Sequence, residues 1–393
     1  MRTISRLGLV LGLLCLGVAT PHITSAAGPP RCGGRVATIV GTPHRDVIRG
    51  TPRSDVIVAR GGADVVRGGA GDDVICGGPG ADLIRGGPGD DELRVGPVRA
   101  LTRPDVVAFD TARRGVHVDL AAGTATGQGR DRIVATETAV RGSSHDDVLL
   151  GDPTTFNELV GLGGDDRLVG GALGDQLAGD SAHGGSASGQ DVLVGGAGDD
   201  ALTGGPGRDV VLGGDGADTF YALPGQPSGS DRLRGGTGDD FIEDVVGPRE
   251  HDRYVGGDGD RDTLWLRTRF QVHGHGRSPS GRMVLDGTWT TFGRRPAHGT
   301  TSAIEQVILP VGAWRVTGTD ADEWLWAPRG VVDRLHRGVH LDGGGGDDNL
   351  IGTEYDDVLI GGAGTDMACG RGGNDRVEAE EQAEQPILLC DPR

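Results

Sequence analysis

The sequence has few of the residues that build a conventional hydrophobic core. Only 4% of its 393 residues are aromatic, whereas glycine alone accounts for 75 of them. A chain of this composition has little large apolar surface to bury. Its order has to come from backbone hydrogen bonds or from bound ions, because otherwise the chain stays disordered. The composition is therefore unlike that of an ordinary packed globule.

Lysine is absent, so the 38 basic residues are all arginine, and they stand against 57 acidic residues. The formal net charge is -19. An acidic excess of this size argues against nucleic acid or an anionic membrane as a partner and favours bound cations.

Long apolar runs are also missing. The apolar stretch from Leu7 to Ala19 is too short to span a bilayer. It follows Arg2 and Arg6 and precedes small residues that end at Ala27, which is typical of a secretory signal peptide over residues 1–27. We therefore expect a secreted, extracellular protein without a transmembrane segment, whose net charge after cleavage is about -21.

Cysteine is scarce, and one of the five lies inside the expected signal peptide. The remaining four are Cys32, Cys76, Cys369 and Cys390. An even number in an exported chain predicts two disulfides, for which three pairings are open. Pairing nearest neighbours would join Cys32 to Cys76 and Cys369 to Cys390, and free thiols are the alternative.

Common catalytic motifs are absent: the chain has no H-E-x-x-H and no G-x-S-x-G. The run Gly179-Asp180-Ser181 with His183 nearby resembles the start of a lipase signature, but it stands in an insertion between repeats. His273 and His275 have no carboxylate or cysteine cluster beside them, which favours a solvent loop over a metal site. We assign no catalytic residue and predict that the protein is not an enzyme.

What the sequence does contain is a period of nine residues. From Gly41 it reads GTPHRDVIR, GTPRSDVIV, ARGGADVVR, GGAGDDVIC, GGPGADLIR and GGPGDDELR without a gap. Aspartate holds the sixth position of each nonamer and an aliphatic residue the eighth. Related copies follow between Asp147 and Asp252 and again between Asp348 and Asp375, which makes about twenty in all.

Each position of the nonamer has a physical role. Glycines at positions one, two and four allow positive φ and tight turns. The aspartate offers hard oxygen, which suits calcium with its six to eight oxygen ligands. Two nonamers should complete one coil, so neighbours in the stack are eighteen residues apart. Aspartates such as Asp64 and Asp82, or Asp200 and Asp218, could then share ions.

Two simpler interpretations compete with calcium binding. Aspartate is common in turns, so the residues could only cap them. The shared register with three glycines argues against this explanation. A disordered acidic chain is the other interpretation, but disorder does not need the apolar residue at position eight. Disorder could still describe the calcium-free state.

The repeats resemble the hemolysin-type calcium-binding (RTX) motif, G-G-x-G-x-D-x-U-x. This resemblance implies an all-β fold, a parallel β-roll or β-solenoid of stacked Gly/Asp-rich coils, with multiple Ca²⁺ ions in the turns. Its metal-binding role carries over to Asp64, Asp73, Asp82, Asp91, Asp191, Asp200, Asp209, Asp218, Asp240, Asp348, Asp357, Asp366 and Asp375. The nonamers GTPHRD and GTPRSD lack two glycines and are expected to form coils without ions. Asp147, Asp175 and Asp231 stand in irregular turns and are left out.

Two segments interrupt the period, and both alternate apolar and polar residues like short strands. They look like diverged copies of one unit, which we interpret as β spacers that continue the solenoid. All five tryptophans lie in or beside the second, and we expect them to pack in the core. The expected organisation is signal peptide 1–27, first RTX array 28–94, spacer 95–141, central array 142–262, Trp-containing spacer 263–341, C-terminal array 342–378 and tail 379–393.

The function that follows is that of a secreted protein binding multiple calcium ions. We expect calcium-induced folding and a structural or interaction role outside the cell. One alternative is a carbohydrate-binding adhesin that uses exposed tryptophan, with a cell-surface or glycan partner. Another is a hydrolase with its active site in 263–341.

Overall fold

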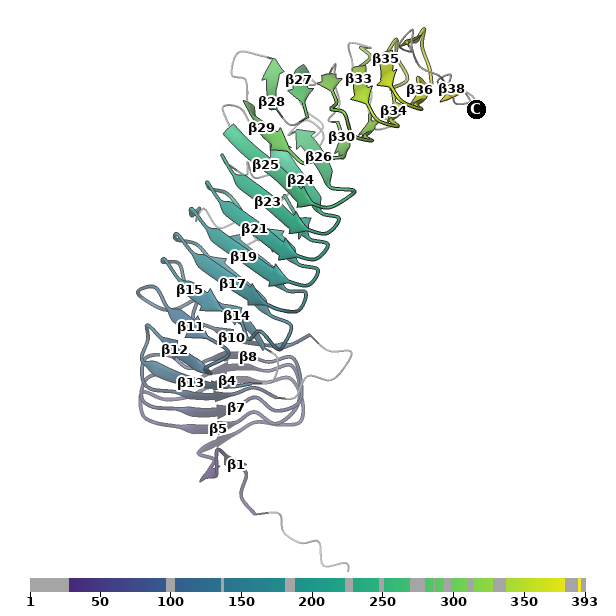
Figure 1. Cartoon of the computed structure of the whole chain (residues 1–393). Helices are drawn as coiled ribbons and strands as arrows, with labels where there is room; N and C mark the ends of the chain where they lie inside the picture. The colour runs from purple at the N-terminus through teal and green to yellow at the C-terminus, as the bar shows by residue number, and fades with distance from the viewer. Residues whose placement is uncertain are drawn as a thin grey trace, which may run out of the picture.

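The computed structural model describes residues 28–96, 103–135, 138–180, 188–222, 229–246, 251–268, 280–285, 287–292, 298–309, 314–327, 337–378 and 388–389. Within these ranges the chain is all-β, and it winds into a parallel β-solenoid of about 13 turns. The coils stack into one elongated body with β1 and β38 at opposite ends (Figure 1). None of the described residues lies in a helix that could cross a membrane.

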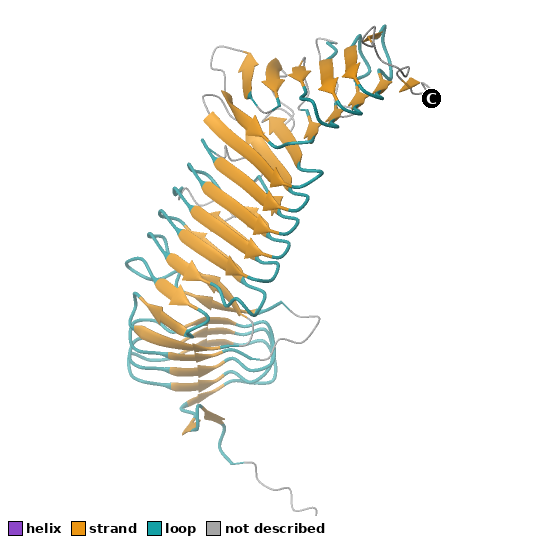
Figure 2. Ribbon diagram, in the orientation of Figure 1, coloured by secondary structure: helices purple, strands orange, loops and turns teal. Residues whose placement is uncertain are grey.

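Two long sheets form opposite walls of the solenoid. Sheet 1 consists of β4 (Val47–Arg49), β6 (Val65–Arg67), β8 (Leu83–Arg85), β10 (Asp105–Ala108), β14 (Thr138–Arg141), β16 (Glu158–Leu162), β18 (Gln176–Asp180), β20 (Ala201–Thr203), β22 (Thr219–Phe220), β24 (Phe241–Val246), β26 (Thr263–Thr268), β30 (Gln306–Ile308), β32 (Trp324–Trp326), β34 (Asn349–Ile351), β36 (Met367–Cys369) and β38 (Leu388–Leu389). The turns that join the sheets run along both edges of the stack (Figure 2).

Sheet 2 forms the facing wall. It consists of β3 (Ile39–Val40), β5 (Val56–Val58), β7 (Val74–Cys76), β9 (Glu92–Arg94), β11 (His117–Asp119), β12 (Thr124–Thr126), β13 (Arg130–Val134), β15 (Val148–Leu150), β17 (Arg167–Gly171), β19 (Val192–Ala197), β21 (Val210–Asp215), β23 (Arg232–Thr237), β25 (His251–Asp258), β27 (Ser280–Val284), β28 (Thr288–Phe292), β29 (His298–Ser302), β31 (Trp314–Thr317), β33 (His340–Gly345), β35 (Val358–Ala363) and β37 (Arg376–Glu378). A separate hairpin of β1 (Arg31–Cys32) and β2 (Arg35–Val36) precedes both sheets.

The nine-residue period becomes one turn and one strand, with successive strands in opposite walls. In sheet 1, Ile48 pairs with Val66 and Val66 with Ile84, each eighteen residues on. In sheet 2, Ile57 pairs with Ile75 in the same way. The predicted spacing of eighteen between neighbours in the stack is confirmed for these regular coils.

A narrow apolar core fills the space between the two walls. The residue at position eight points inward from every strand of the first array and is at most 8% exposed. These side chains are Ile48, Ile57, Val66, Ile75, Ile84 and Leu93. Each coil thus contributes two aliphatic residues, and stacking buries them in a continuous column.

The two interrupting segments insert strands into sheet 2 in reversed order. The first supplies β11, β12 and β13, of which β13 pairs parallel with the preceding β9 and β11 with the following β15. Strand β12 lies between them and is antiparallel to both. The second repeats this arrangement with β29 beside β25, β27 beside β31 and an antiparallel β28 between. The shared topology supports their being copies of one unit, while the division of the chain into separate domains stays a prediction.

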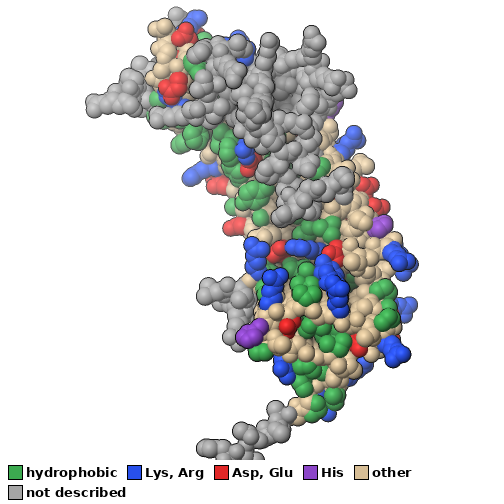
Figure 3. Space-filling model, turned by 180° about the vertical axis from the view of Figure 1, so that it is seen from behind, with side chains coloured by type: hydrophobic (Ala, Val, Ile, Leu, Met, Phe, Trp, Pro, Cys, Tyr) green, Lys and Arg blue, Asp and Glu red, His purple; other side chains and the backbone are tan. Residues whose placement is uncertain are grey.

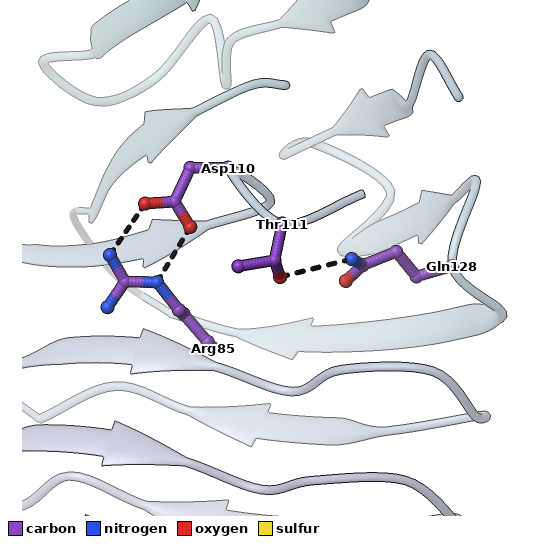
Figure 4. A network of polar contacts seen from close by, with 4 residues as sticks. All are labelled: Arg85, Asp110, Thr111 and Gln128. Carbon is purple, nitrogen blue, oxygen red and sulfur yellow. Dashed lines mark hydrogen bonds and ion pairs between the residues drawn. The ribbon is translucent and has the colours of Figure 1, made fainter. Parts of the chain in front are cut away.

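Polar contacts fasten the first insert to the repeats before it. The guanidinium of Arg85 on β8 donates two hydrogen bonds of 2.6 Å to the carboxylate of Asp110, which follows β10 (Figure 4). This contact raises the pKa of Arg85 and lowers that of Asp110. Next to it, the Gln128 amide donates to the hydroxyl of Thr111 at 3.4 Å. The insert is therefore joined to sheet 1 as well as to sheet 2.

The expectation that the tryptophans pack in the core is only partly right. Trp314 is buried at 2% exposure, but Trp324 and Trp326 are 52% and 42% exposed. They flank the inward Leu325 on β32, so the alternation of a strand places both outside. Trp265 packs edge-on against Phe241 with ring centroids 6.2 Å apart.

Candidate metal centre

The predicted aspartates stand directly before the strands and turn inward at the two edges of the solenoid. Twelve of the thirteen are between 1% and 3% exposed, which is unusual for a carboxylate. They are Asp64, Asp73, Asp82, Asp91, Asp191, Asp200, Asp209, Asp218, Asp240, Asp348, Asp357 and Asp366. Asp375, in the last repeat coil, is half-buried.

One oxygen of each carboxylate ties its coil to the previous one. The backbone N–H of Asp64 donates to Oδ1 of Asp82 at 2.8 Å, and that of Asp73 donates to Oδ1 of Asp91 at 2.8 Å. The same bond joins Asp200 to Asp218. These bonds form two ladders: the first precedes the strands of sheet 1 and the second those of sheet 2. The predicted neighbours therefore do lie on adjacent coils.

The ladders also contain residues outside the predicted ligand set: some belong to the looser copies of the repeat, and others, such as Asp105, Asp131, Glu305 and Glu323, were not identified by the period of nine. The first also passes through Asp105, Asn157, Asp175, Asp262, Glu305 and Glu323, and the second through Asp131, Asp147, Asp166, Asp231 and Asp252. Each stands two residues before an aliphatic or aromatic core residue, as Asp105 does before Val107 and Glu305 before Val307. A carboxylate or amide residue two positions before an apolar core residue is therefore the sequence signal that could have identified these ladder positions.

The second carboxylate oxygen is the feature that points to a cation. In most repeats Oδ2 is buried and has no hydrogen-bond partner. This holds for Asp64, Asp73, Asp82, Asp91, Asp166, Asp175, Asp191, Asp200, Asp209, Asp218, Asp240, Asp262 and Asp348. A buried charged oxygen without a donor is strongly destabilising unless a counter-ion is present.

Glycine at position one is needed to make room around this oxygen. A Cβ atom added to Gly213 would lie 2.0 Å from Oδ2 of Asp218, and one on Gly68 would lie 2.3 Å from Oδ2 of Asp73. Any side chain there would fill the space that Oδ2 faces. The glycines thus leave a small cradle beside each orphaned oxygen, at the place where the sequence pattern predicts an ion.

Burial also changes the acidity of these groups. It raises the pKa of Asp82 to about 7, and the charges of Asp105 and Asp64 add to this effect. Burial raises the pKa of Asp209 to about 8, with further contributions from Asp191, Asp180 and Asp244. Near neutral pH such carboxyls either hold a proton or need a nearby cation.

In coils whose second position is Thr or Ser, the ladder carboxylate does have hydrogen-bond donors besides the amide of the previous coil. Thr51 donates to Oδ2 of Asp55 from its backbone N–H at 2.7 Å and from its hydroxyl at 2.8 Å. Thr42 does the same for Asp46. The structure therefore supplies donors in the two nonamers that we expect to form coils without ions. Thr353 also donates to Asp357, which separates this predicted ligand from the others.

The donor set fits calcium in the glycine-containing coils. Calcium prefers hard oxygen ligands and tolerates irregular geometry, and most such turns offer an unpartnered carboxylate oxygen inside a cradle. The ligands would be the orphaned Oδ2 atoms. When bound, calcium would supply positive charge to two rows of buried carboxylates. Which of the predicted residues ligate an ion stays a prediction.

The predicted cysteine pairs have different outcomes. Cys32 and Cys76 are joined by a disulfide with an S–S distance of 2.04 Å, which attaches β1 to β7. Cys369 carries a free thiol in this structure, so its predicted bond is not formed here, and Cys390 lies outside the described residues. Leu389 pairs with Ala368, and the two cysteines are the next residues in sequence. The bond between them stays a prediction for the oxidised protein.

The remaining candidates lie partly outside the described residues. These include Ser181, His183, His273 and His275. Asp180 is described and buried, and neither of its carboxylate oxygens has a hydrogen-bond partner. It stands beside Gly205 at the edge of the second ladder.

Comparison with known proteins agrees with this geometry. The family model described as the RTX calcium-binding nonapeptide repeat (4 copies) matches residues 40–75, 74–96, 155–181, 186–220, 228–243 and 342–377. No curated protein matches the chain. The matched segments contain most of the ladder aspartates, with their glycine cradles and orphaned oxygens. The chain therefore carries RTX calcium-binding nonapeptide repeats in several copies, and the matched repeats lie in its β-solenoid.

Proposed function

We propose that the protein folds in response to calcium and acts outside the cell as a structural or interaction protein without catalytic activity. The observation that carries this proposal is the pair of ladders with buried, unpartnered Oδ2 atoms. Without cations, facing carboxylates in adjacent coils repel one another and oppose stacking. Calcium reverses the sign of that interaction, so ion binding and folding become one event.

Two features support an extracellular site of action. Disulfides persist mainly in oxidising compartments, and Cys32 and Cys76 form one. Residues 1–27, which lie outside the described part, have the pattern of a secretory signal peptide. Extracellular modules bind calcium in roughly the 0.1–1 mM range, which would keep the chain unfolded inside the cell and fold it after export.

Calcium titration of residues 28–393 tests the proposal. Far-UV circular dichroism should change from a coil-like to a β-rich spectrum as calcium is added, and revert with chelator. Isothermal titration should show binding at several sites. No binding up to about 10 mM calcium, well above the range of extracellular modules, would refute it. A β-rich spectrum that ignores both calcium and chelator would show that packing and the disulfide suffice.

A second candidate function is carbohydrate binding, which the exposed tryptophans favour. Trp324 and Trp326 lie on the outer face of β32. A cavity of about 590 Å³ beside Trp324 is lined by Asp260, Arg261, Glu305, Gln306, Asp322 and Trp324 itself. Aromatic faces next to carboxylate and amide groups suit a neutral sugar. Glycan-array binding that is lost in Trp324→Ala and Trp326→Ala would support this role.

A hydrolase with its active site in 263–341 is the remaining alternative. The same cavity carries the carboxyl groups of Asp260, Glu305 and Asp322. Glu305 already accepts a hydrogen bond of 2.8 Å from the Asp262 amide as part of the first ladder. If glycan binding is found, product analysis of the same glycans distinguishes a lectin from a hydrolase.

A further inference from the structure

Three buried carboxylates meet inside the solenoid, where β23 and β25 begin and β24 passes its midpoint. One ligand oxygen from each of Asp231, Asp244 and Asp252 lies within 4.8 Å of the others. Their side chains are only 3%, 1% and 1% exposed. Asp231 and Asp252 belong to the second ladder, and the Asp231 amide donates to Oδ1 of Asp252 at 3.0 Å. Asp244 is on neither ladder.

The position of Asp244 in the repeat makes the cluster unusual. It stands four residues after a ladder aspartate, where other copies have glycine, such as Gly195, Gly204 and Gly213. In those copies a Cβ would come within 2.0–2.4 Å of the next ladder carboxylate. At this one turn the chain places a whole carboxylate in the glycine position. The next ladder residue, Asp252, follows after eight residues instead of the usual five.

One hydroxyl group faces the cluster. Tyr254 is fully buried, and its O–H lies 2.7 Å from Oδ2 of Asp244 and 3.4 Å from Oδ2 of Asp252. Burial, and next the charge of Asp244, raise the pKa of Asp231.

A small cavity opens on the same carboxylates. It measures about 20 Å³, and Asp209, Asp231, Asp244 and Gly204 are among its lining residues. This is room for one water molecule or one ion. Asp209 is 1% exposed, and its Oδ2 has no partner. That oxygen lies 2.4 Å from the Cβ position of Gly204, on the cavity side, while Oδ1 is held by the Asp191 amide.

We infer that Asp231, Asp244 and Asp252 bind one further divalent cation of the size of calcium, in a site of clustered side-chain carboxylates that the repeat register does not generate. Calcium–oxygen distances of about 2.3–2.6 Å place opposite ligands about 4.6–5.2 Å apart, so three oxygens within 4.8 Å fit one coordination shell. The site adjoins the second ladder. The inference rests on the proposed calcium-dependent function for the identity of the ion.

Counting bound ions tests the inference. Native mass spectrometry of residues 28–393 in calcium should show one ion fewer for Asp244→Asn than for the unchanged chain. Asp258→Asn is the matched control, because Asp258 is an exposed carboxylate at the end of β25, and it should retain the full number. Equal counts for Asp244→Asn and the unchanged chain would overturn the inference alone. An unchanged chain that binds no calcium would overturn the proposed function as well.

A second measurement uses the unchanged protein and therefore does not require a variant to fold. Anomalous diffraction from crystals of the unchanged protein soaked with terbium should place an ion among the three carboxylates beside Tyr254. Filled repeat sites with no anomalous peak at this cluster would show that protons alone neutralise it, and the inference would be wrong.

Discussion

At the scale of single residues, most ladder aspartates in the glycine-containing coils use their two oxygens differently. Oδ1 accepts the amide hydrogen of the previous coil and so fixes the register between coils. Oδ2 is left to face a glycine cradle without a donor. A substitution that keeps Oδ1 as a hydrogen-bond acceptor but removes the negative charge distinguishes the structural role of the side chain from its role in ion binding.

Asp200→Asn makes this separation. We expect its calcium affinity to fall at the affected turn, with a loss of stability in calcium on the order of 1–3 kcal/mol, because a charged ligand is replaced by a neutral one. In chelator, where we expect a coil-like chain, the variant and the unchanged chain should give the same circular dichroism spectrum, because Asp200 has no buried position to occupy. Thermal unfolding in calcium and circular dichroism in chelator measure the two effects.

Asp199→Asn is the control for that comparison. Asp199 is the neighbouring residue, is exposed, and accepts a hydrogen bond of 2.9 Å from the Ala217 amide. It should change neither calcium binding nor stability by more than about 0.5 kcal/mol. Equal effects of the two substitutions would contradict a special role for Oδ2 of Asp200.

The raised acidities predict how calcium binding depends on pH. Burial raises the pKa of Asp191 and Asp240 to about 7 and that of Asp166 to about 8. Since the folded, calcium-free chain binds these protons more tightly than the unfolded chain, its stability should fall as pH rises from about 4 to 8. Calcium must displace the protons, so its affinity should rise over pH 6–8, by about tenfold per pH unit for each proton released.

Isothermal titration at pH 6, 7 and 8 in buffers of different ionisation enthalpy measures both the affinity and the proton release. A calcium affinity that stays constant between pH 6 and pH 8 would show that these carboxyls are already ionised without the metal.

At the scale of the strand and turn, most of the fold could be predicted from the sequence. Each nonamer carries its own turn glycines, its ladder aspartate and its core residue, so strand position and inward face follow from one copy. The reversed inserts could not be predicted, because their pairing joins residues at irregular separations. The Asp91 amide reaches Asp131 forty residues away, and the Asp262 amide reaches Glu305 forty-three residues away.

Only part of the candidate site could be predicted, because some of its residues also lie at irregular separations along the chain. The period identified the aspartates in regular copies but not Asp105, Asp131 and Glu305. These three residues hold equivalent positions in the ladders, but the turns around them are irregular. The exposure of Trp324 and Trp326 was missed because the segment was treated as a spacer without a register. Assigning Leu325 to position eight would have placed both tryptophans outside.

The disulfide should stabilise the N-terminal coils. Cys32 and Cys76 are separated by 44 positions in the sequence, and closing such a loop in the unfolded chain contributes about 4 kcal/mol. We therefore expect the double variant Cys32→Ser and Cys76→Ser to unfold at lower denaturant concentration in its first coils. Hydrogen exchange of β4 to β9 in calcium reports on that region, and the C-terminal strands β33 to β37 serve as an internal control. Unchanged exchange in both regions would contradict a stabilising role.

At the scale of the whole molecule, a large part of the acidic charge lies inside the solenoid and not on its surface. The buried aspartates outnumber the net charge of -19, so the rest of the chain is net basic. Outward arginines such as Arg49, Arg67 and Arg85 lie in register on sheet 1. Arginine side chains are prominent over the N-terminal coils when the molecule is seen from behind (Figure 3). The argument from net charge against anionic partners therefore applies to the unfolded chain rather than to the folded one.

Ion-exchange chromatography can test this distribution. In chelator we expect the chain to bind an anion exchanger tightly, because its carboxylates are exposed and ionised. In saturating calcium the same chain should elute at lower salt, because the ladder charges are buried and neutralised. Urea-unfolded protein with calcium is the control for simple screening by the ion. Identical elution of folded protein in calcium and in chelator would show that the carboxylates are not neutralised.

The reversed three-strand inserts have a consequence for how such a protein can change. A segment of several tens of residues enters sheet 2 and leaves it with the strands on either side still in parallel register. Because each coil contacts only its neighbours, added sequence at a turn leaves distant coils undisturbed. A lineage, or a designer, can therefore add a segment of this kind between two coils without altering the rest of the rod.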